Sequence, residues 1–112
     1  MTTKGANIMA TKKKTAALRA VIVRAYSGVF YGRLVSKRGA SVELRGARQV
    51  WSWDSAGMAE KVMTCGDIAR IGLGGGSKMS GPVDAIIEQV GAVFFATPEA
   101  IRLLEAQRWA SK

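Results

Sequence analysis

The chain has 112 residues, of which 48% are hydrophobic, and its 17 lysines and arginines against 8 aspartates and glutamates give a formal net charge of +9. This length is expected to hold a single domain with a hydrophobic core, which argues against a wholly disordered chain. The absence of histidine excludes histidine-based acid–base catalysis and most zinc sites, and the single Cys65 excludes an internal disulfide and a thiolate metal cage.

The positive charge is concentrated toward the N-terminus. Nine bases precede the first acid, Glu43, whereas eight bases balance eight acids from Glu43 onward. This excess predicts an anionic partner, which is a nucleic acid, a nucleotide or an anionic surface. We expect residues 1–15 to be a flexible basic arm and residues 16–112 to form one α+β domain. The alternative for the arm is a solvated tail that aids solubility.

The sequence offers no membrane-spanning segment. Arg19 and Arg24 interrupt the apolar run around them, whereas a spanning helix needs about 20 apolar residues. No continuous apolar stretch lies between Lys12–Lys14 and Arg19, so no secretory signal is predicted. We therefore expect a cytoplasmic protein without a membrane partner.

The first half of the chain predicts short strands joined by tight turns. Gly28 and Gly39 stand in turn sequences, and Gly39 is suited to a positive φ. Gly46 is expected to separate the last two strands. The segments rich in β-branched or alternating residues are Leu18–Ala25, Val29–Ser36, Ser41–Leu44 and Ala47–Trp53. This order predicts an antiparallel meander.

A helix is expected after the fourth strand. Asp54 or Ser55 can cap a helix over Ala56–Thr64, which Gly66 would end. The segment Val83–Phe95 then returns to a strand-like composition. The helix is therefore expected to be inserted between strands.

A second helix is expected at the C-terminal end. Thr97 as N-cap and Pro98 at the first helical position predict where it begins, and it should run to about Trp109. Ile101 and Leu104 are expected to face the core. The predicted fold class is α+β: an antiparallel β-meander of four to six strands with one inserted helix and a C-terminal helix.

The run Gly74-Gly75-Gly76-Ser77-Lys78 contains the residue types that can cradle a phosphate. A P-loop needs the pattern G-x-x-x-x-G-K-[ST] between a strand and a helix. Here Ser77 precedes Lys78 and Met79 follows it, so that motif is absent. Two interpretations stay open: a flexible loop that offers N–H groups and Lys78 to an anion, and a plain linker.

The acidic residues do not suggest an active site. They stand singly along the chain, without the pairing or clustering that hydrolytic or metal chemistry needs. Cys65 has no histidine to activate it and is expected to be a buried helix residue. We therefore expect no enzyme, no cofactor and no metal.

Two tryptophans near the end of the fourth strand favour binding. Trp51 and Trp53 alternate onto one face of the strand that also holds Arg48. On an exposed face they would offer a stacking surface for bases beside a guanidinium that can bind phosphate. The alternative is that both rings belong to the core.

A second small cluster lies at the first hairpin. Arg24 would supply positive charge, and Gly28 beside Ser27 would let a ligand approach the backbone closely. The alternative is that Arg24 is an exposed charge at the end of a strand.

The blocks Arg24-Ala25-Tyr26-Ser27-Gly28-Val29 and Ala47-Arg48, the latter followed by Trp51 and Trp53, resemble a family of small phage proteins. Looser similarity extends the resemblance over residues 20–102 and leaves out the basic arm. The family includes the Thoeris anti-defence sponges, which bind cyclic nucleotide signals made by bacterial immune systems such as Thoeris and CBASS. The sponges keep these signals from their effectors. One departure is Gln49, where the family usually has a second arginine.

The resemblance implies a homo-oligomer, a hexamer, in the cytoplasm of an infected bacterial host. It would bind cyclic ADP-ribose isomers or cyclic oligonucleotides at subunit interfaces without altering them. Together with the arginine and aromatic residues described above, the resemblance gives a set of candidate ligand-binding residues: Arg24, Ser27 and Gly28 from one subunit and Arg48, Lys78 or Arg102 from another, with Trp51 from the strand pattern as a stacking residue.

Two alternative functions stay open. The basic first half is also typical of a small nucleic-acid-binding β domain, in which the N-terminal arm would contact the polymer. Its affinity for long DNA or RNA would fall steeply with salt. The other alternative is a structural virion or assembly protein, whose oligomer is its function.

Overall fold

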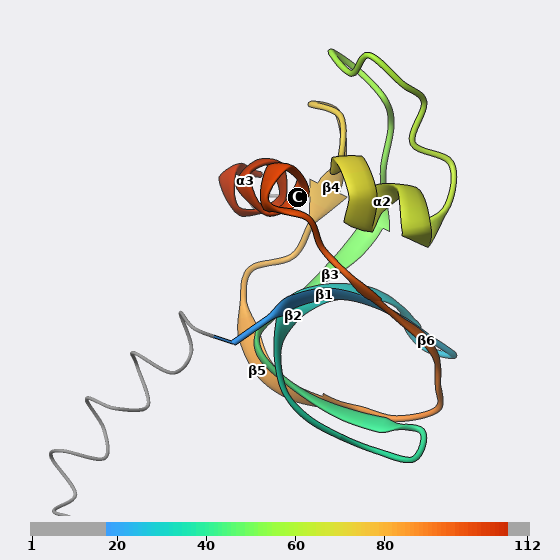
Figure 1. Cartoon of the computed structure of the whole chain (residues 1–112), viewed down its shortest axis with the longest axis vertical. Helices are drawn as coiled ribbons and strands as arrows, with labels where there is room; N and C mark the ends of the chain where they lie inside the picture. Colours follow the sequence, from blue (N-terminus) through green and yellow to red (C-terminus); the bar gives the residue numbers. More distant parts are fainter. Residues whose placement is uncertain (1–17, 108–112) are drawn as a thin grey trace, which may run out of the picture.

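A curled antiparallel sheet carries two helices on its outer side (Figure 1). The structure is a computed structural model that describes residues 18–107, so the predicted basic arm and Trp109 lie outside the described residues. The predicted α+β class, with one inserted and one C-terminal helix, is confirmed. The elements are β1 (Ala20–Ala25), β2 (Gly28–Arg38), β3 (Ser41–Ser52), α2 (Cys65–Ile71), β4 (Lys78–Met79), β5 (Val83–Ile87), β6 (Val90–Phe95) and α3 (Pro98–Ala106).

The strands follow the order β4-β3-β2-β1-β6, and β5 pairs with β3 beside β4. In Figure 1 the strands β1, β2, β3, β5 and β6 trace a ring, with α2 and α3 outside it. The inner face holds one core, which includes Val21, Val23 and Leu44. The outer face holds a second core under the helices, which includes Ile22 and Leu104. Side chains of β1 therefore alternate between two cores, which explains its continuous apolar run.

β3 is one strand, and the prediction of two strands separated at Gly46 is wrong. Gly46 has φ +61°, and the pairing of β3 with β5 shifts between Leu44 and Ala47. Its N–H group donates to Asp84 Oδ1 at 2.9 Å. Such an irregularity bends a strand without ending it. Gly46 therefore turns β3 within the curled sheet.

The inserted helix begins later than predicted. Residues 56–64 contain no helix, and α2 begins after Thr64, with Gly66 in its first turn rather than after its end. Thr64 and Asp67 form a capping box. The Thr64 hydroxyl accepts a hydrogen bond from the Asp67 N–H group, and the Asp67 carboxylate accepts one from the Thr64 N–H group. Asp54 is occupied elsewhere, in the glycine-rich loop. The reciprocal cap at Thr64 therefore fixes the start of the helix.

The C-terminal helix begins as predicted. The Thr97 side chain accepts a hydrogen bond from the Ala100 N–H, and Pro98 occupies the first turn. Leu104 is fully buried, and Ile101 packs against the same core. The helix ends at Ala106. These contacts place α3 across the outer face of the sheet.

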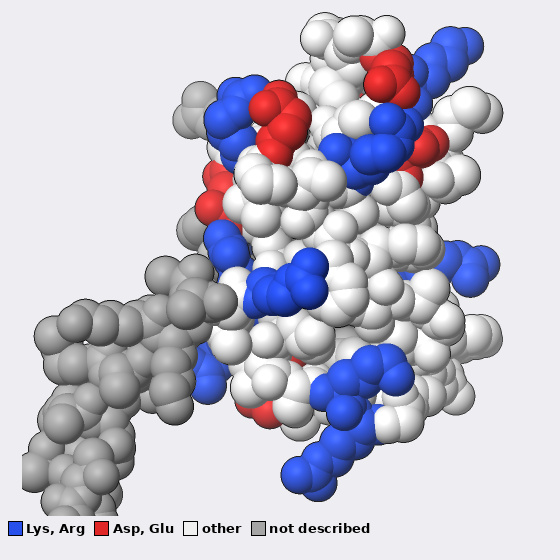
Figure 2. All heavy atoms as spheres, viewed as in Figure 1, with Lys and Arg blue, Asp and Glu red and all other residues white. Residues whose placement is uncertain are grey.

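Basic side chains are spread over the face seen in Figure 2, and acidic ones lie among them. They do not gather into a single stripe on this face. Within residues 18–107, the structure has no helix with the length and apolar character that crossing a membrane requires.

Candidate functional site: the Arg24 pocket

A cavity of about 460 Å³ opens where the β1–β2 hairpin and β6 meet the beginning of α2. We name it the Arg24 pocket. Cavities of this volume are common for small-molecule sites. Its lining residues are Arg24, Val29, Trp53, Met63, Thr64, Cys65, Gly66 and Phe94.

The position of Arg24 follows from the alternation of β1. Ala20 and Ile22 contribute to the core under the helices, and Arg24 is the next residue on that face. It pairs with Val29 on β2 and Ala92 on β6. The helix α2 does not cover this end of β1, so Arg24 stays exposed at the pocket wall.

Two aromatic residues, Trp53 and Phe94, line the pocket. Phe94 pairs with Ile22 and so shares the helix-covered face of the sheet. Trp53 follows the last residue of β3, is half-buried and packs against the same core. The pocket therefore combines one guanidinium with two rings, which suits a ligand that has both a phosphate and a base.

The remaining wall comes from the start of α2. The N–H groups of Met63 and Thr64 donate to Asp67 Oδ2 at 3.1 and 3.2 Å, and these bonds hold the pKa of Asp67 below its usual range. Burial raises the pKa of the Cys65 thiol, with Arg24 acting in the opposite direction. Cys65 therefore contributes a neutral, half-buried thiol.

Arg24 forms no ion pair within residues 18–107. Its Nη1 atom lies over β6, where a Cβ added at Gly91 would be 3.7 Å away. The guanidinium is thus placed by the sheet but not neutralised by it. This leaves its hydrogen-bond donors available for an anion.

The other residues predicted at the first hairpin lie at its tip. Gly28 has φ +141°, and a Cβ there would be 2.7 Å from Gln49 Nε2. That side-chain amide donates to the Ser27 carbonyl at 3.3 Å. Ser27 and Gly28 therefore shape the turn beside Arg24, and neither lines the pocket.

Arg48 has a different position from the one predicted. It is 6% exposed. Its Nε, Nη1 and Nη2 atoms donate to the carbonyls of Ser80, Leu104 and Gln107 at 2.8, 3.2 and 2.9 Å. It holds the end of α3 against β3, and a role in ligand binding would require these bonds to break.

Trp51 and Lys78 lie at the end of the sheet that holds the β1–β2 hairpin, but outside the pocket. Trp51 is 56% exposed, in contrast to the half-buried Trp53. Lys78 is exposed on β4 and pairs with Ser52. Neither residue joins Arg24 within this chain.

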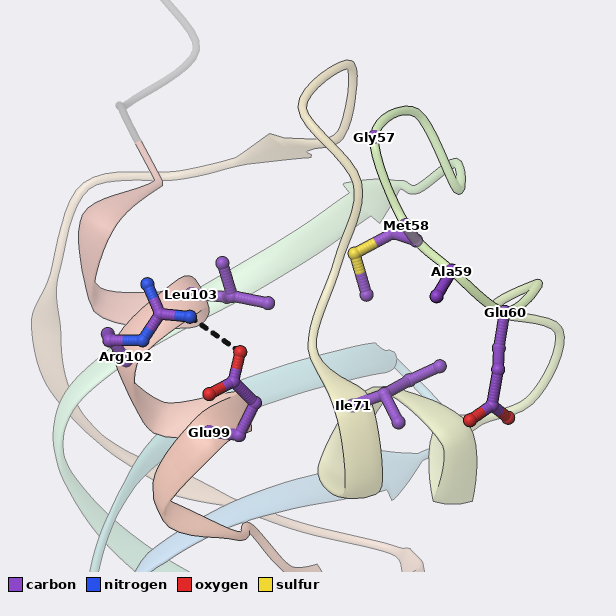
Figure 3. A pocket seen from close by; sticks show the side chains of 8 residues that line it. All are labelled: Gly57, Met58, Ala59, Glu60, Ile71, Glu99, Arg102 and Leu103. Carbon is purple, nitrogen blue, oxygen red and sulfur yellow. Dashed lines mark hydrogen bonds and ion pairs between the residues drawn. The ribbon is translucent and has the colours of Figure 1, made fainter.

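Arg102 lines a second cavity of about 320 Å³ (Figure 3). Its side chain is turned to Glu99 on α3, with Nη2 2.5 Å from the carboxylate. The other acid there, Glu60, pairs with Arg70. Because the charges of this cavity are already paired, we regard the Arg24 pocket as the better candidate site.

The glycine-rich loop does not offer its N–H groups to an anion. Those of Gly74 and Gly76 donate to the carbonyl and the carboxylate of Asp54, that of Gly75 to the Ala56 carbonyl, and that of Ser77 to Gly74. The interpretation of this loop as a flexible phosphate cradle is therefore wrong. Gly74 and Gly76 are needed because Asp54 packs directly against both and Ala56 against Gly74, whereas a Cβ at Gly75 would meet nothing within 4 Å.

Sequence reasoning did not identify Phe94, Met63 or Cys65 as lining residues. Phe94 belongs to an apolar segment whose composition predicts a strand. Only the pairing of β6 with β1 brings Phe94 close to Arg24. No sequence signal marks that long-range pairing. Among residues 18–107, no group of three or more histidine, cysteine or acidic side chains could hold a metal ion.

A family described as a domain of unknown function (DUF6948) matches residues 18–104. The chain belongs to this family. The DUF6948 match includes every lining residue of the Arg24 pocket and leaves out the basic arm. No curated protein and no solved structure matches the chain.

Proposed function

We propose that this protein binds and sequesters a cyclic nucleotide immune signal without cleaving it. The signal is a cyclic ADP-ribose isomer or a cyclic oligonucleotide. The protein would act as an anti-defence sponge in the cytoplasm of an infected bacterium. The observation that carries the proposal is Arg24, a cation without an acidic partner in residues 18–107, on the wall of a cavity that also presents Trp53 and Phe94.

The chemistry of the pocket supports this ligand class. A guanidinium binds the two free oxygens of a phosphate in a forked geometry. Aromatic rings stack on nucleobases whatever their sequence. The resemblance of residues 20–102 to the Thoeris sponges points to the same ligands.

A homo-oligomer, a hexamer by the same resemblance, belongs to this proposal. Tyr26 at the hairpin tip and Met63 at the pocket rim are 89% and 72% exposed. A second subunit seated on this rim would remove both side chains from water. Light scattering of the full chain measures the oligomer, and a monomer would contradict a pocket completed by a second subunit.

Titration calorimetry against a panel of cyclic ADP-ribose isomers and cyclic di- and trinucleotides tests the binding itself. We expect a member of the panel to bind and to be recovered intact by chromatography. Arg24→Gln should weaken that binding by about tenfold or more. Arg38→Gln is the matched control. It also removes one arginine, but at the last residue of β2, which does not line the pocket.

No binding across the panel, or equal affinity of the Arg24→Gln variant, would contradict the proposal. Salt-sensitive binding to long DNA or RNA in place of the panel would favour a nucleic-acid-binding domain instead.

A further inference from the structure

The Arg24 pocket presents one positive charge and no negative charge. Apart from Arg24, its lining side chains are aliphatic, aromatic, hydroxyl, thioether or thiol groups. The nearby Asp67 does not line the pocket, and its carboxylate accepts hydrogen bonds from the N–H groups of Met63 and Thr64 and from Arg70. A ligand therefore meets a single cation set in a largely apolar wall.

The charge of this lining is constant over the neutral pH range. The guanidinium groups of arginines are not deprotonated in proteins. Cys65 is the other titratable side chain of the wall, and burial holds its pKa above the usual value, so the thiol is neutral. Asp67 stays ionised because its pKa is lowered by backbone hydrogen bonds. We therefore expect a change in binding between weakly acidic and weakly basic pH to come from the ligand.

Two kinds of phosphate meet this wall differently. A phosphodiester is a monoanion with two free oxygens, which one guanidinium can bind and neutralise. A terminal phosphate monoester loses a second proton with a pKa of about 6 and is then a dianion with three oxygens. The second charge would face apolar side chains, and burying an unpaired charge is costly.

We propose that the Arg24 pocket selects the phosphodiester of a cyclic mono- or oligonucleotide over the terminal phosphate monoester of the corresponding linear, 5′-phosphorylated nucleotide. This inference rests on the proposed function and deepens it. The protein holds the closed ring and discriminates against the opened, 5′-phosphorylated product. A sponge with this preference is not saturated by the degradation products of its own ligand.

Two pairs of compounds test the preference by calorimetry on the full chain. The first pair is 3′,5′-cyclic AMP with 5′-AMP, and the second is cyclic di-AMP with linear 5′-phosphorylated diadenylate. At about pH 8 we expect the cyclic member that binds to do so about tenfold more tightly than its linear counterpart. At about pH 5.5 the monoester becomes a monoanion, so the ratio should fall several-fold while the affinity of the cyclic compound stays the same.

A second cation should relax the selection. Met63→Lys places an ammonium at the exposed pocket rim. It should improve binding of the linear compounds more than that of the cyclic ones at about pH 8. Val83→Lys is the matched control, since Val83 is 61% exposed on β5 and does not line the pocket. Circular dichroism of both variants checks that the fold is kept.

Equal affinity for cyclic and linear members at the higher pH would overturn the inference and leave the proposed function standing. A preference that neither the lower pH nor Met63→Lys reduces would also overturn it, because charge would not be its cause. If neither cyclic compound binds, the inference fails. The wider panel then decides whether the proposed function fails with it.

Discussion

Arg24 and Arg48 both project from the helix-covered face of the sheet, and their guanidinium groups meet opposite surroundings. Arg48 is buried beneath the end of α3, where three carbonyl groups accept its hydrogen bonds. Arg24 is exposed beside the beginning of α2 and forms no ion pair within the described residues. One region uses its cation to hold the fold, and the other presents its cation to the solvent and to a cavity.

The difference depends on what covers each strand. The carbonyls at the C-terminal end of a helix lack partners within the helix, and a buried arginine can satisfy them. The helix α2 begins at Cys65, and its first residues line the pocket beside Arg24, with no acidic side chain in the lining. On this face of the sheet, Arg48 is therefore buried under a helix, whereas Arg24 stays exposed beside the beginning of one.

Arg48→Met should have the largest effect on stability. It leaves three carbonyl groups without their buried donor, and we expect a loss of about 3 kcal/mol in the free energy of unfolding. Urea denaturation followed by circular dichroism measures it, with Arg38→Gln as the control for charge. A loss below about 1 kcal/mol would show that Arg48 is not an anchor of α3.

Gly74→Ala should have the next largest effect on stability. A Cβ at Gly74 would collide with the backbone N–H of Ala56 and the carbonyl of Asp54, so the loop must open. We expect the free energy of unfolding to fall by about 2 kcal/mol. Gly75→Ala is the control one residue away, where a Cβ meets nothing within 4 Å. Equal thermal midpoints for the two variants would contradict the closed loop.

Glu105 ties α3 to β2, and its contribution should depend on pH. Burial acts to raise its pKa, but hydrogen bonds from the Tyr31 hydroxyl and Arg33 outweigh it and hold the pKa below its usual value. A carboxyl group of this kind stabilises the fold above its unfolded pKa of about 4.3, and the stabilisation is lost as the pH falls through the folded value.

Glu105→Gln should therefore cost about 1 kcal/mol near neutral pH, a figure already reduced because the carboxylate is partly exposed. The difference from the unmodified protein should shrink when denaturation is repeated below about pH 4. Glu99→Gln is the control, since that acid pairs with Arg102 on the surface of the same helix. A pH-independent difference would mean that packing rather than charge holds this end of α3.

Arg24→Met should change stability least, by less than about 0.5 kcal/mol, because no ion pair with an acid is lost. The same variant should lose nucleotide binding. Thermal unfolding with and without ligand separates the two effects. A large loss of stability without ligand would remove the contrast with Arg48.

Local signals in the sequence were enough to predict much of the fold. Gly39 adopts φ +55° in the second hairpin, and Thr97 and Pro98 begin α3 as expected. These features depend on backbone chemistry within a few residues, which a sequence displays directly. The inserted helix was misplaced because Asp54 and Thr64 are both good caps, and the sequence does not show that Asp54 binds the glycine-rich loop.

The site was harder to predict because it is built from distant segments. Arg24, Trp53 and Phe94 come from three parts of the chain, and the pairing of β1 with β6 brings two of them together. Arg48 carried the same sequence signal as Arg24. Its acceptors at Leu104 and Gln107 lie more than 50 positions away and are fixed only by the packing of α3.

The four consecutive buried residues at the start of β1 have a consequence for how the molecule opens. Ala20 and Ile22 belong to the core under the helices, and Val21 and Val23 belong to the core inside the ring. Neither core can come apart without exposing the strand that it shares with the other. Amide hydrogens of β1 should therefore exchange with solvent at the rate of global unfolding, in a single cooperative transition. The strand that carries Arg24 should then open only when the whole domain unfolds.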